Sequence, residues 1–287
     1  MSTAQIAVPL RWTDLDAQGH VNNVCYAEYL QQARAVCFRA DQPDAPLASG
    51  CVVSSHQINY QRPISWDDQP LRVELAISDV GAARFEISYR IFQGDQECAQ
   101  ALTVMCPFDF ASQSPRRLSA VEREFLAELA GPRVELKNFA TPPLLGRGHR
   151  LAVYPRWSDV DRYGHVNNVR FLDYVLAGRV ASTTAADPSL ARVGMGNSEA
   201  VRWLIARQDI DYLGQLVYRP QPYVVLSAPT RLGESSITLA SEIIDPLAGD
   251  KVLAASRSVL VCTTEKGVKR AIPQSGRQAL EKLLISE

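Results

Sequence analysis

The stretch RWTDLDAQGHVNNVCYAEYLQQAR, residues Arg11–Arg34, returns later in the chain as RWSDVDRYGHVNNVRFLDYVLAGR, residues Arg156–Arg179, without a gap. Both copies contain the pattern D-x-D-x-x-G-H-V-N-N, and the copies lie 145 residues apart (159 minus 14, counted from the first aspartate of each). This period is far longer than the unit of about 20–50 residues that builds a solenoid. The match therefore indicates two copies of one domain.

Two further matches extend the duplication along the chain. INYQRPISW, ending at Trp66, matches IDYLGQLVY, ending at Tyr218, with an offset of 152, so the second copy has gained seven residues (152 minus 145). ALTVMCPFD also resembles SRSVLVCTT, and placing Cys106 over Cys262 gives an offset of 156. We predict one domain over residues 1–135, a linker over 136–146 that is rich in proline and glycine, and a second domain over 147–287.

Hydrophobic periodicity predicts the same order of elements in each copy. Apolar residues alternate at Ile6, Val8, Leu10 and Trp12, which is typical of a strand. Asn23 then opens a helix whose apolar face has spacings of three and four, formed by Tyr26, Tyr29, Leu30, Ala33 and Cys37, and in the second copy by Phe171, Tyr174 and Val175. Strand-like runs follow at residues 52–60, 71–80, 84–93 and 98–109.

Each copy ends in a short helix, at sites where Ser119 with Glu122 and Ser275 with Gln278 fit the capping-box pattern. The amphipathic long helix needs a partner for its apolar face, and the sheet is the only partner available. We therefore predict an α+β fold with two domains, each a curved antiparallel sheet wrapped around a long central helix.

Composition excludes several classes of function. The net charge is −1, so neither nucleic acid nor an anionic membrane is expected as a partner. The N-terminal residues do not resemble a signal peptide, and no apolar run reaches the length of a membrane span, so we expect a cytoplasmic protein. The six cysteines and four histidines lack ligand spacing, so neither a metal nor another cofactor is expected.

The element order and the D-x-D-x-x-G-H-V-N-N segment resemble the hotdog-fold thioesterases, in particular the 4-hydroxybenzoyl-CoA thioesterase-like family and the plant acyl-ACP thioesterases. The resemblance covers nearly the whole chain, twice, and it implies hydrolysis of an acyl-CoA or acyl-ACP thioester to a free acid and a thiol. A fused pair of hotdog domains implies an internal pseudo-dimer with the acyl thioester in its seam. We expect such pseudo-dimers to assemble further into homo-oligomers.

The resemblance assigns the second aspartate of each motif, Asp16 and Asp161, as general base or nucleophile. The backbone N–H at the start of the following helix, at Asn23 and Asn168, would polarise the thioester carbonyl. This role suits a helix N-terminus, where backbone donors and the positive end of the dipole meet. The remaining residues expected to contact substrate are Gly19, His20, Gly164 and His165.

Several alternatives stay open at this stage. Asp14 and Asp159 suit a cap or a turn, and His20 and His165 suit either catalysis or a packed, hydrogen-bonded structural role. Gln18 keeps an amide where the plant enzymes have asparagine, whereas Tyr163 does not, which favours Asp16 over Asp161 as the more active carboxylate. The rival functions are a non-catalytic acyl-CoA-binding module and a hotdog enoyl-thioester hydratase or dehydratase. Arg11 and Arg156 could contact a phosphate, or could be solvated strand charges.

Overall fold

The computed structural model describes residues 3–139, 142–190, 202–264 and 267–285. Within it the chain divides into unit 1, Met1–Asn138, and unit 2, Phe139–Glu287. None of the helices in these described ranges is long and apolar enough to cross a membrane.

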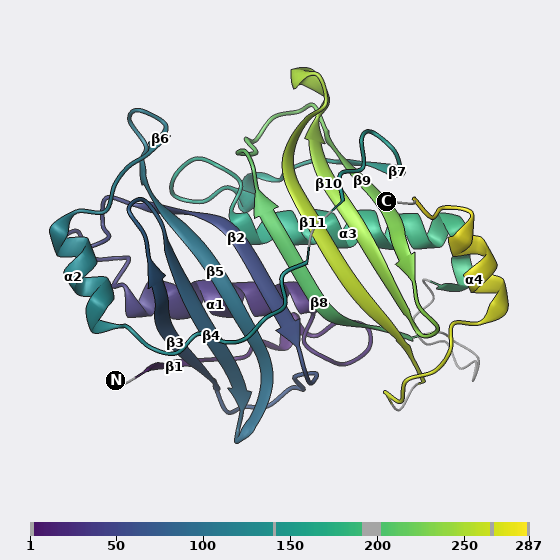
Figure 1. Cartoon of the computed structure of the whole chain (residues 1–287), viewed down its shortest axis with the longest axis horizontal. Helices are drawn as coiled ribbons and strands as arrows, with labels where there is room; N and C mark the ends of the chain where they lie inside the picture. The colour runs from purple at the N-terminus through teal and green to yellow at the C-terminus, as the bar shows by residue number, and fades with distance from the viewer. Residues whose placement is uncertain (1–2, 140–141, 191–201, 265–266, 286–287) are drawn as a thin grey trace. The chain divides into compact units, whose positions relative to one another are not determined.

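Unit 1 is an antiparallel sheet with the strand order β1-β3-β4-β5-β2 and a long helix, α1, on one face (Figure 1). Its elements in chain order are β1 (Ala4–Val8), η1 (Trp12–Asp14), α1 (Asn23–Cys37), β2 (Cys51–Tyr60), β3 (Leu71–Val80), β4 (Phe85–Gln93), β5 (Gln96–Asp109), β6 (Ser114–Pro115) and α2 (Ala120–Glu128).

Unit 2 repeats this topology, with the strand order β7-β9-β10-β11-β8 and the long helix α3. Its elements are β7 (His149–Val153), η2 (Trp157–Asp159), α3 (Asn168–Ala186), η3 (Pro188–Leu190), β8 (Arg202–Tyr212), β9 (Tyr223–Leu232), β10 (Ser236–Asp245), η4 (Pro246–Ala248), β11 (Lys251–Thr263) and α4 (Gln274–Glu281). The predicted α+β fold, two antiparallel sheets each with a long helix, is confirmed.

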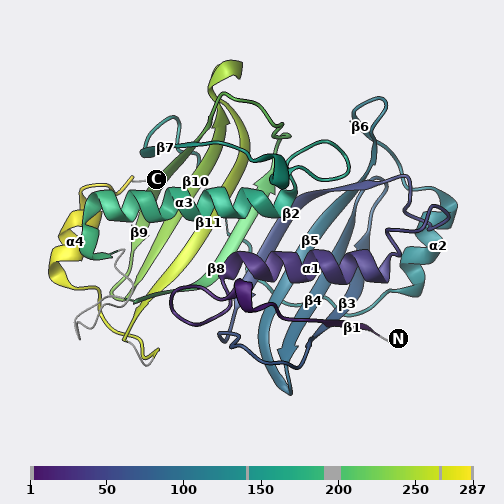
Figure 2. The same cartoon turned by 180° about the vertical axis from the view of Figure 1, so that it is seen from behind.

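Each long helix lies across the strands of its own unit, as the view from behind shows (Figure 2). In α1 the residues Ala27, Leu30 and Ala33 have no exposed surface, and the inward side chains of the sheet, such as Leu75 and Ile87, are equally buried. Full burial of a leucine side chain stabilises a fold by about 1.5–3 kcal/mol, so this helix–sheet contact forms the core of the unit.

α3 packs closely on its sheet at Gly178. A Cβ atom added there would lie 2.4 Å from Cγ1 of Val225, a distance that real Cβ contacts do not reach. Unit 1 has Ala33 at the matching position of the repeat. The glycine therefore lets α3 approach β9 more closely than a side chain would allow.

α3 also accounts for part of the seven-residue insertion in the second copy. It has 19 residues where α1 has 15, so four of the extra residues lengthen the helix (19 minus 15). Residues 191–201, between η3 and β8, lie outside the described residues, as do residues 140–141 of the predicted linker.

Two local predictions were wrong. β1 ends at Val8, which pairs with Leu71, the first residue of β3, so no partner strand remains for Leu10 and Trp12. Trp12 instead begins the short helix η1. α4 begins at Gln274 after Pro273, without a side-chain cap, so Ser275 lies inside the first turn rather than before it.

The last strand of each unit carries a buried hydroxyl opposite a buried polar residue of the neighbouring strand. Thr103 pairs with His56 in unit 1, and Ser258 pairs with Gln208 in unit 2. The Nδ1 atom of His56 lies 2.8 Å from Oγ1 of Thr103. Gln208 therefore occupies in unit 2 the place that His56 has in unit 1.

This pairing sets the offset of the last strand at 155 (258 minus 103), so the predicted match of Cys106 with Cys262 was wrong by one residue. Cys106 is half-buried and Cys262 is buried, as expected for residues on opposite faces of a strand. Similar sequence around both cysteines misled the alignment, whereas the pairing of the strands fixes the register.

Glu122 at the start of α2 provides a test of acid sensitivity. Burial acts to raise the pKa of its carboxyl, but hydrogen bonds from Arg116 and Ser119 outweigh this and lower it overall. A carboxylate with a lowered pKa stabilises the fold at neutral pH and loses this effect as the pH falls through its folded-state pKa. We expect Glu122→Gln to lower the free energy of unfolding by about 1 kcal/mol at pH 7.

The deficit of Glu122→Gln relative to wild type should shrink as the pH falls below the ordinary range of a glutamate and through the lowered folded-state pKa of Glu122. Urea titrations at pH 7 and pH 3.5 measure it. A deficit of equal size at both pH values would contradict the role of the charge. Glu124→Gln is the matched control, since that carboxylate on the same helix is exposed and its loss should change the stability little.

Candidate active site

A tight turn between η1 and α1 positions Asp16. Its backbone N–H donates to the carbonyl of His20 (2.8 Å), and its carbonyl accepts from the N–H of Gly19 (3.0 Å). Gly19 has a φ of 78°, in the left-handed region that favours glycine. Unit 2 repeats this turn, with Asp161 bonded to His165 (2.9 Å) and Gly164 (3.0 Å) and a φ of 80° at Gly164.

The end of each turn is fixed against two neighbouring segments. In unit 1 the Val21 N–H donates to the carbonyl of Ile64 (2.9 Å), and the Asn22 N–H donates to the carbonyl of Asp14 (2.8 Å). In unit 2 the matching bonds run from Val166 to Leu216 (2.9 Å) and from Asn167 to Asp159 (2.8 Å). These bonds fix where each long helix begins relative to the aspartate before it.

Both asparagines of each motif serve the helix start. Asn22 is the N-cap of α1, where its Oδ1 accepts from the Val24 N–H (3.1 Å), and Asn167 caps α3 in the same way (3.0 Å). Asn23 is the first residue of α1, and its carbonyl accepts from the hydroxyl of Tyr60 (3.0 Å). The N–H groups of this first turn carry the positive end of the helix dipole.

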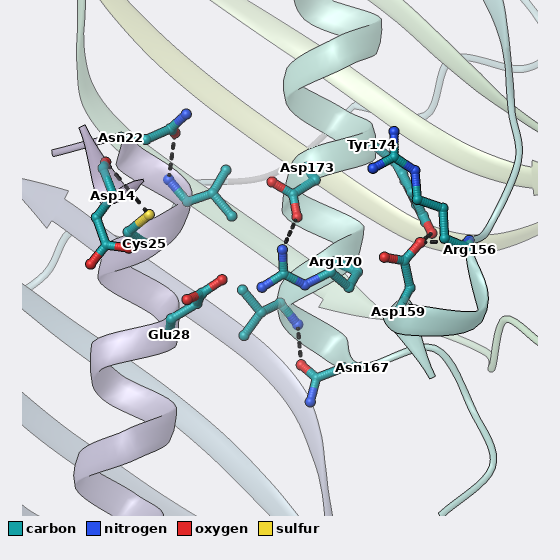
Figure 3. A network of polar contacts seen from close by, with 12 residues as sticks. Asp14, Asn22, Cys25, Glu28, Arg156, Asp159, Asn167, Arg170, Asp173 and Tyr174 are labelled. Carbon is teal, nitrogen blue, oxygen red and sulfur yellow. Dashed lines mark hydrogen bonds and ion pairs between the residues drawn. The ribbon is translucent and has the colours of Figure 1, made fainter. Parts of the chain in front are cut away.

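The first aspartate of the motif is held by three donors. The Oδ2 atom of Asp14 accepts from the Arg11 N–H (3.0 Å) and the Tyr29 hydroxyl (2.8 Å), and its Oδ1 accepts from Nε of Arg11 (2.9 Å). In unit 2, Asp159 accepts from the Arg156 N–H (2.7 Å) and the Tyr174 hydroxyl (2.7 Å). Figure 3 shows Asp159 beside Tyr174 and Arg156. Both carboxylates therefore tie the short helix to the long one.

Tyr29 and Tyr174 have a role that the sequence reasoning missed. The spacing placed both on the apolar face of the helix, but each donates its hydroxyl to the first aspartate. Burial, followed by this hydrogen bond, raises the pKa of both tyrosines, so they remain protonated donors. Their identity at matching positions of the two copies was the available signal.

The second aspartate of each motif is better placed than the first to act as a base or nucleophile, because fewer donors hold its carboxylate. The Oδ1 atom of Asp16 accepts from the backbone N–H of Gln18 (2.7 Å) and, more weakly, from that of His20 (3.4 Å). Oδ1 of Asp161 accepts from the N–H of Tyr163 (2.9 Å). Among the described residues, Oδ2 of neither carboxylate accepts a hydrogen bond, and both side chains are half-buried. Each turn therefore orients one carboxylate oxygen and leaves the other available.

The residues that differ between the motifs sit in different surroundings. The Oε1 atom of Gln18 is enclosed and has no hydrogen-bond partner in the described part of the chain. Tyr163 instead accepts a hydrogen bond from the exposed Arg162 (2.8 Å), whose guanidinium also lies 4.9 Å from its ring centre. Gln18 thus offers an unsatisfied acceptor beside Asp16, whereas Tyr163 is directed to a neighbouring cation.

The motif histidines take part in the turns through their backbones. The carbonyls of His20 and His165 accept from the second aspartates, and both side chains are half-buried. Within the described ranges neither imidazole ring makes a hydrogen bond, which argues against the hydrogen-bonded structural role considered from the sequence. Nor do these ranges hold a group of three or more histidine, cysteine, aspartate or glutamate residues suited to a metal ion.

The contacts of the first aspartates predict unequal effects of one substitution. Asp14 is 3% exposed, so Asp14→Asn should lower the free energy of unfolding by about 1–3 kcal/mol, because an amide cannot replace a charged acceptor of three bonds. Asp159→Asn should lower the free energy of unfolding by less, because Asp159 is half-buried and its carboxylate receives no hydrogen bond from the side chain of Arg156. Denaturant titration of both variants measures the difference, and equal losses would contradict this assignment.

The two units together define a tandem hotdog fold, and comparison with known proteins agrees. A family model described as the thioesterase-like superfamily matches residues 10–129 and again 155–280. The chain therefore belongs to the thioesterase-like superfamily, which supports thioester hydrolysis as its general class of reaction. No curated protein matches the chain by sequence.

Two solved structures share the fold over most of their length. A 12:0-ACP thioesterase from Umbellularia californica is 13% identical, with a TM-score of 0.72 over 91% of this chain and 94% of its own. An acyl-ACP thioesterase from Bacteroides thetaiotaomicron is 14% identical, with a TM-score of 0.62 over 90% of this chain and 97% of its own. At these identities the likeness supports the fold and leaves the substrate to be argued from the site.

Proposed function

We propose that this protein hydrolyses an acyl-CoA or acyl-ACP thioester to a free acid and a thiol, with Asp16, Asp161 or both as the catalytic carboxylate. One observation carries the proposal. In both units the motif turn orients a half-buried carboxylate by one oxygen, leaves the second without a hydrogen bond in the described chain, and leads directly into a capped helix N-terminus.

The start of each long helix would supply the oxyanion site. The caps use the N–H groups of Val24 and Val169, and the N–H of the residue before each, Asn23 or Asn168, would donate to the thioester oxygen. Backbone donors and the helix dipole act where negative charge develops, and removal of one such donor typically costs about 10²–10³ in kcat. Gly19, His20, Gly164 and His165 would line the approach to this point.

In the general-base route, the carboxylate removes a proton from water while the water oxygen attacks the carbonyl carbon. The carbonyl electrons move to the oxygen, which the helix N–H holds, and they return as the C–S bond breaks. The thiolate then takes the proton from the carboxyl group. In the nucleophilic route, the carboxylate itself attacks the carbonyl carbon, the C–S bond breaks and the thiolate leaves, which gives an acyl anhydride. Water then cleaves the anhydride to the free acid and the aspartate, and the thiolate takes up the released proton. Single turnover in H₂¹⁸O distinguishes them, since only the anhydride route can place ¹⁸O in the aspartate.

The direct test is a thiol-release assay on a panel of acyl-CoAs of different chain length, together with one acyl-ACP. We expect release of thiol and free acid in equal amounts. A hydratase or dehydratase would change enoyl thioesters without releasing thiol. A binding module would show a raised melting temperature with ligand and no turnover. Either result would overturn the proposed hydrolysis.

A further inference from the structure

Two exposed aromatic side chains in unit 2 have no part in the chemistry described above. Trp157 is 73% exposed and Tyr218 is 51% exposed. Their ring centres lie 5.5 Å apart at an interplanar angle of 83°, an edge-to-face contact. We call Trp157 and Tyr218 the aromatic pair. Large aromatic rings that stay in water in this way are typical of binding surfaces.

The aromatic pair flanks the motif turn of its own unit. Trp157 belongs to η2, two residues before Asp159, whose carbonyl accepts from the start of α3. Tyr218 lies two residues after Leu216, whose carbonyl accepts from the Val166 N–H. A molecule seated on the pair would therefore lie close to the turn that carries Asp161.

A cation adjoins the pair. Arg156 is exposed, and in the part of the chain that the structure describes its guanidinium forms no ion pair, while its backbone N–H bonds to Asp159. Its repeat partner Arg11 differs, because that guanidinium is paired with Asp14 and Glu28. Unit 1 also has exposed aromatic residues at the two matching positions, Trp12 and Trp66. Among the described residues, unit 2 differs in that its adjoining arginine is not engaged by a carboxylate.

We infer that Arg156, Trp157 and Tyr218 bind the adenosine phosphate portion of coenzyme A, with the adenine on the aromatic pair and a phosphate on Arg156. The inference rests on the proposed thioester hydrolysis and adds to it the carrier, acyl-CoA. Adenine stacks on aromatic rings, and a guanidinium is suited to phosphate. An acyl carrier protein presents the acyl–pantetheine arm without adenine, so it would leave the pair unused.

The test compares two substrates with the same acyl group, an acyl-CoA and the S-acyl-pantetheine that lacks the nucleotide. Trp157→Ala should raise KM for the acyl-CoA by about 5- to 150-fold, the loss expected for one stacked base, and leave kcat unchanged. KM for the acyl-pantetheine should not change. Trp157→Phe should retain most of the affinity, and Arg156→Gln should raise KM for the acyl-CoA alone.

Trp12→Ala is the matched control, since Trp12 is 72% exposed at the same position of the other copy but lies beside the engaged Arg11. It should leave both KM values unchanged. Equal losses on both substrates with Trp157→Ala would overturn the inference. A loss of equal size on an acyl-ACP would also overturn it, because the pair would then be a protein-docking surface.

Calorimetric titration with adenosine 3′,5′-bisphosphate separates the inference from the proposed function. Binding to the wild type that weakens at least fivefold in Trp157→Ala would support the nucleotide site even if no thioester were hydrolysed. Turnover of acyl-CoA without any measurable nucleotide binding would leave the hydrolysis standing and overturn the site.

Discussion

Replacement of both Asp16 and Asp161 by asparagine is expected to lower kcat by about 10²–10⁴, the usual contribution of a positioned base or nucleophile. The turns should survive, because an asparagine Oδ1 can still accept the backbone N–H groups that Asp16 and Asp161 now bind. The variant loses the carboxylate charge alone, so its effect reports on chemistry rather than on folding.

The two single variants measure how much each copy contributes to turnover. We expect Asp16→Asn to lower kcat more than Asp161→Asn does. The reason is that the enclosed Oε1 of Gln18 has no hydrogen-bond partner in the described chain, whereas Tyr163 is hydrogen-bonded to Arg162. Each single variant should keep the activity of the other site, and the double variant should lose both.

Measurement of kcat with one acyl-CoA, and of the melting temperature, is needed for wild type, both single variants and the double variant. Wild-type turnover by a folded double variant would reduce these aspartates to turn residues and remove the catalytic interpretation of the motif. A melting temperature lowered by more than a few degrees would instead assign them to folding. Asp68→Asn, at an exposed carboxylate outside the motif, serves as the control.

Arg207→Met is expected to lower the free energy of unfolding of unit 2 by about 3–5 kcal/mol, because it leaves a buried carboxylate without the cation that is hydrogen-bonded to it. The side chains of Arg207 and Asp209 on β8 are only 6% and 10% exposed, and two guanidinium nitrogens contact the two carboxylate oxygens. Burial raises the pKa of Asp209 even though Arg207 and Arg257 act to lower it. Keeping this carboxylate ionised therefore lowers the stability of the folded state.

The raised pKa fixes the sign of the pH dependence. A carboxyl group whose folded-state pKa lies above its unfolded value stabilises the fold more as the pH falls through the folded value. Without Arg207 the same carboxyl should take up a proton more readily. The deficit of Arg207→Met should therefore be largest at pH 7 and should shrink as the pH falls toward about 4.

Guanidinium titrations at several pH values measure this deficit, with unchanged m-values as the sign that the folded state is intact. The double variant Arg207→Met/Asp209→Leu, which removes both charges, should recover most of the loss. A double variant as unstable as Arg207→Met alone would mean that Arg207 stabilises unit 2 through packing or through Phe139, whose ring centre lies 5.7 Å from its Cζ, rather than through the charge of Asp209.

The sequence by itself determined the duplication, the element order and the start of each long helix. Those features depend on short-range signals: the alternation of strands, the three-and-four spacing of helices, and the asparagines that cap α1 and α3. The capping box of Ser119 and Glu122 is such a signal, and α2 has both of its bonds. A local signal succeeds where the interaction that decides the structure lies within about four residues along the chain.

The tertiary structure decided which partner each side chain meets. The hydroxyls of Tyr29 and Tyr174 reach the first aspartates 15 residues earlier in the chain. β1 ends opposite the first residue of its partner strand β3, and the register of β11 follows from its pairing with β8. Contacts of this kind form only when strands and helices come together on folding, because buried polar groups must find a hydrogen-bond partner on a neighbouring element. The periodicity of the sequence predicts each element by itself but does not predict which residue of another element will face it.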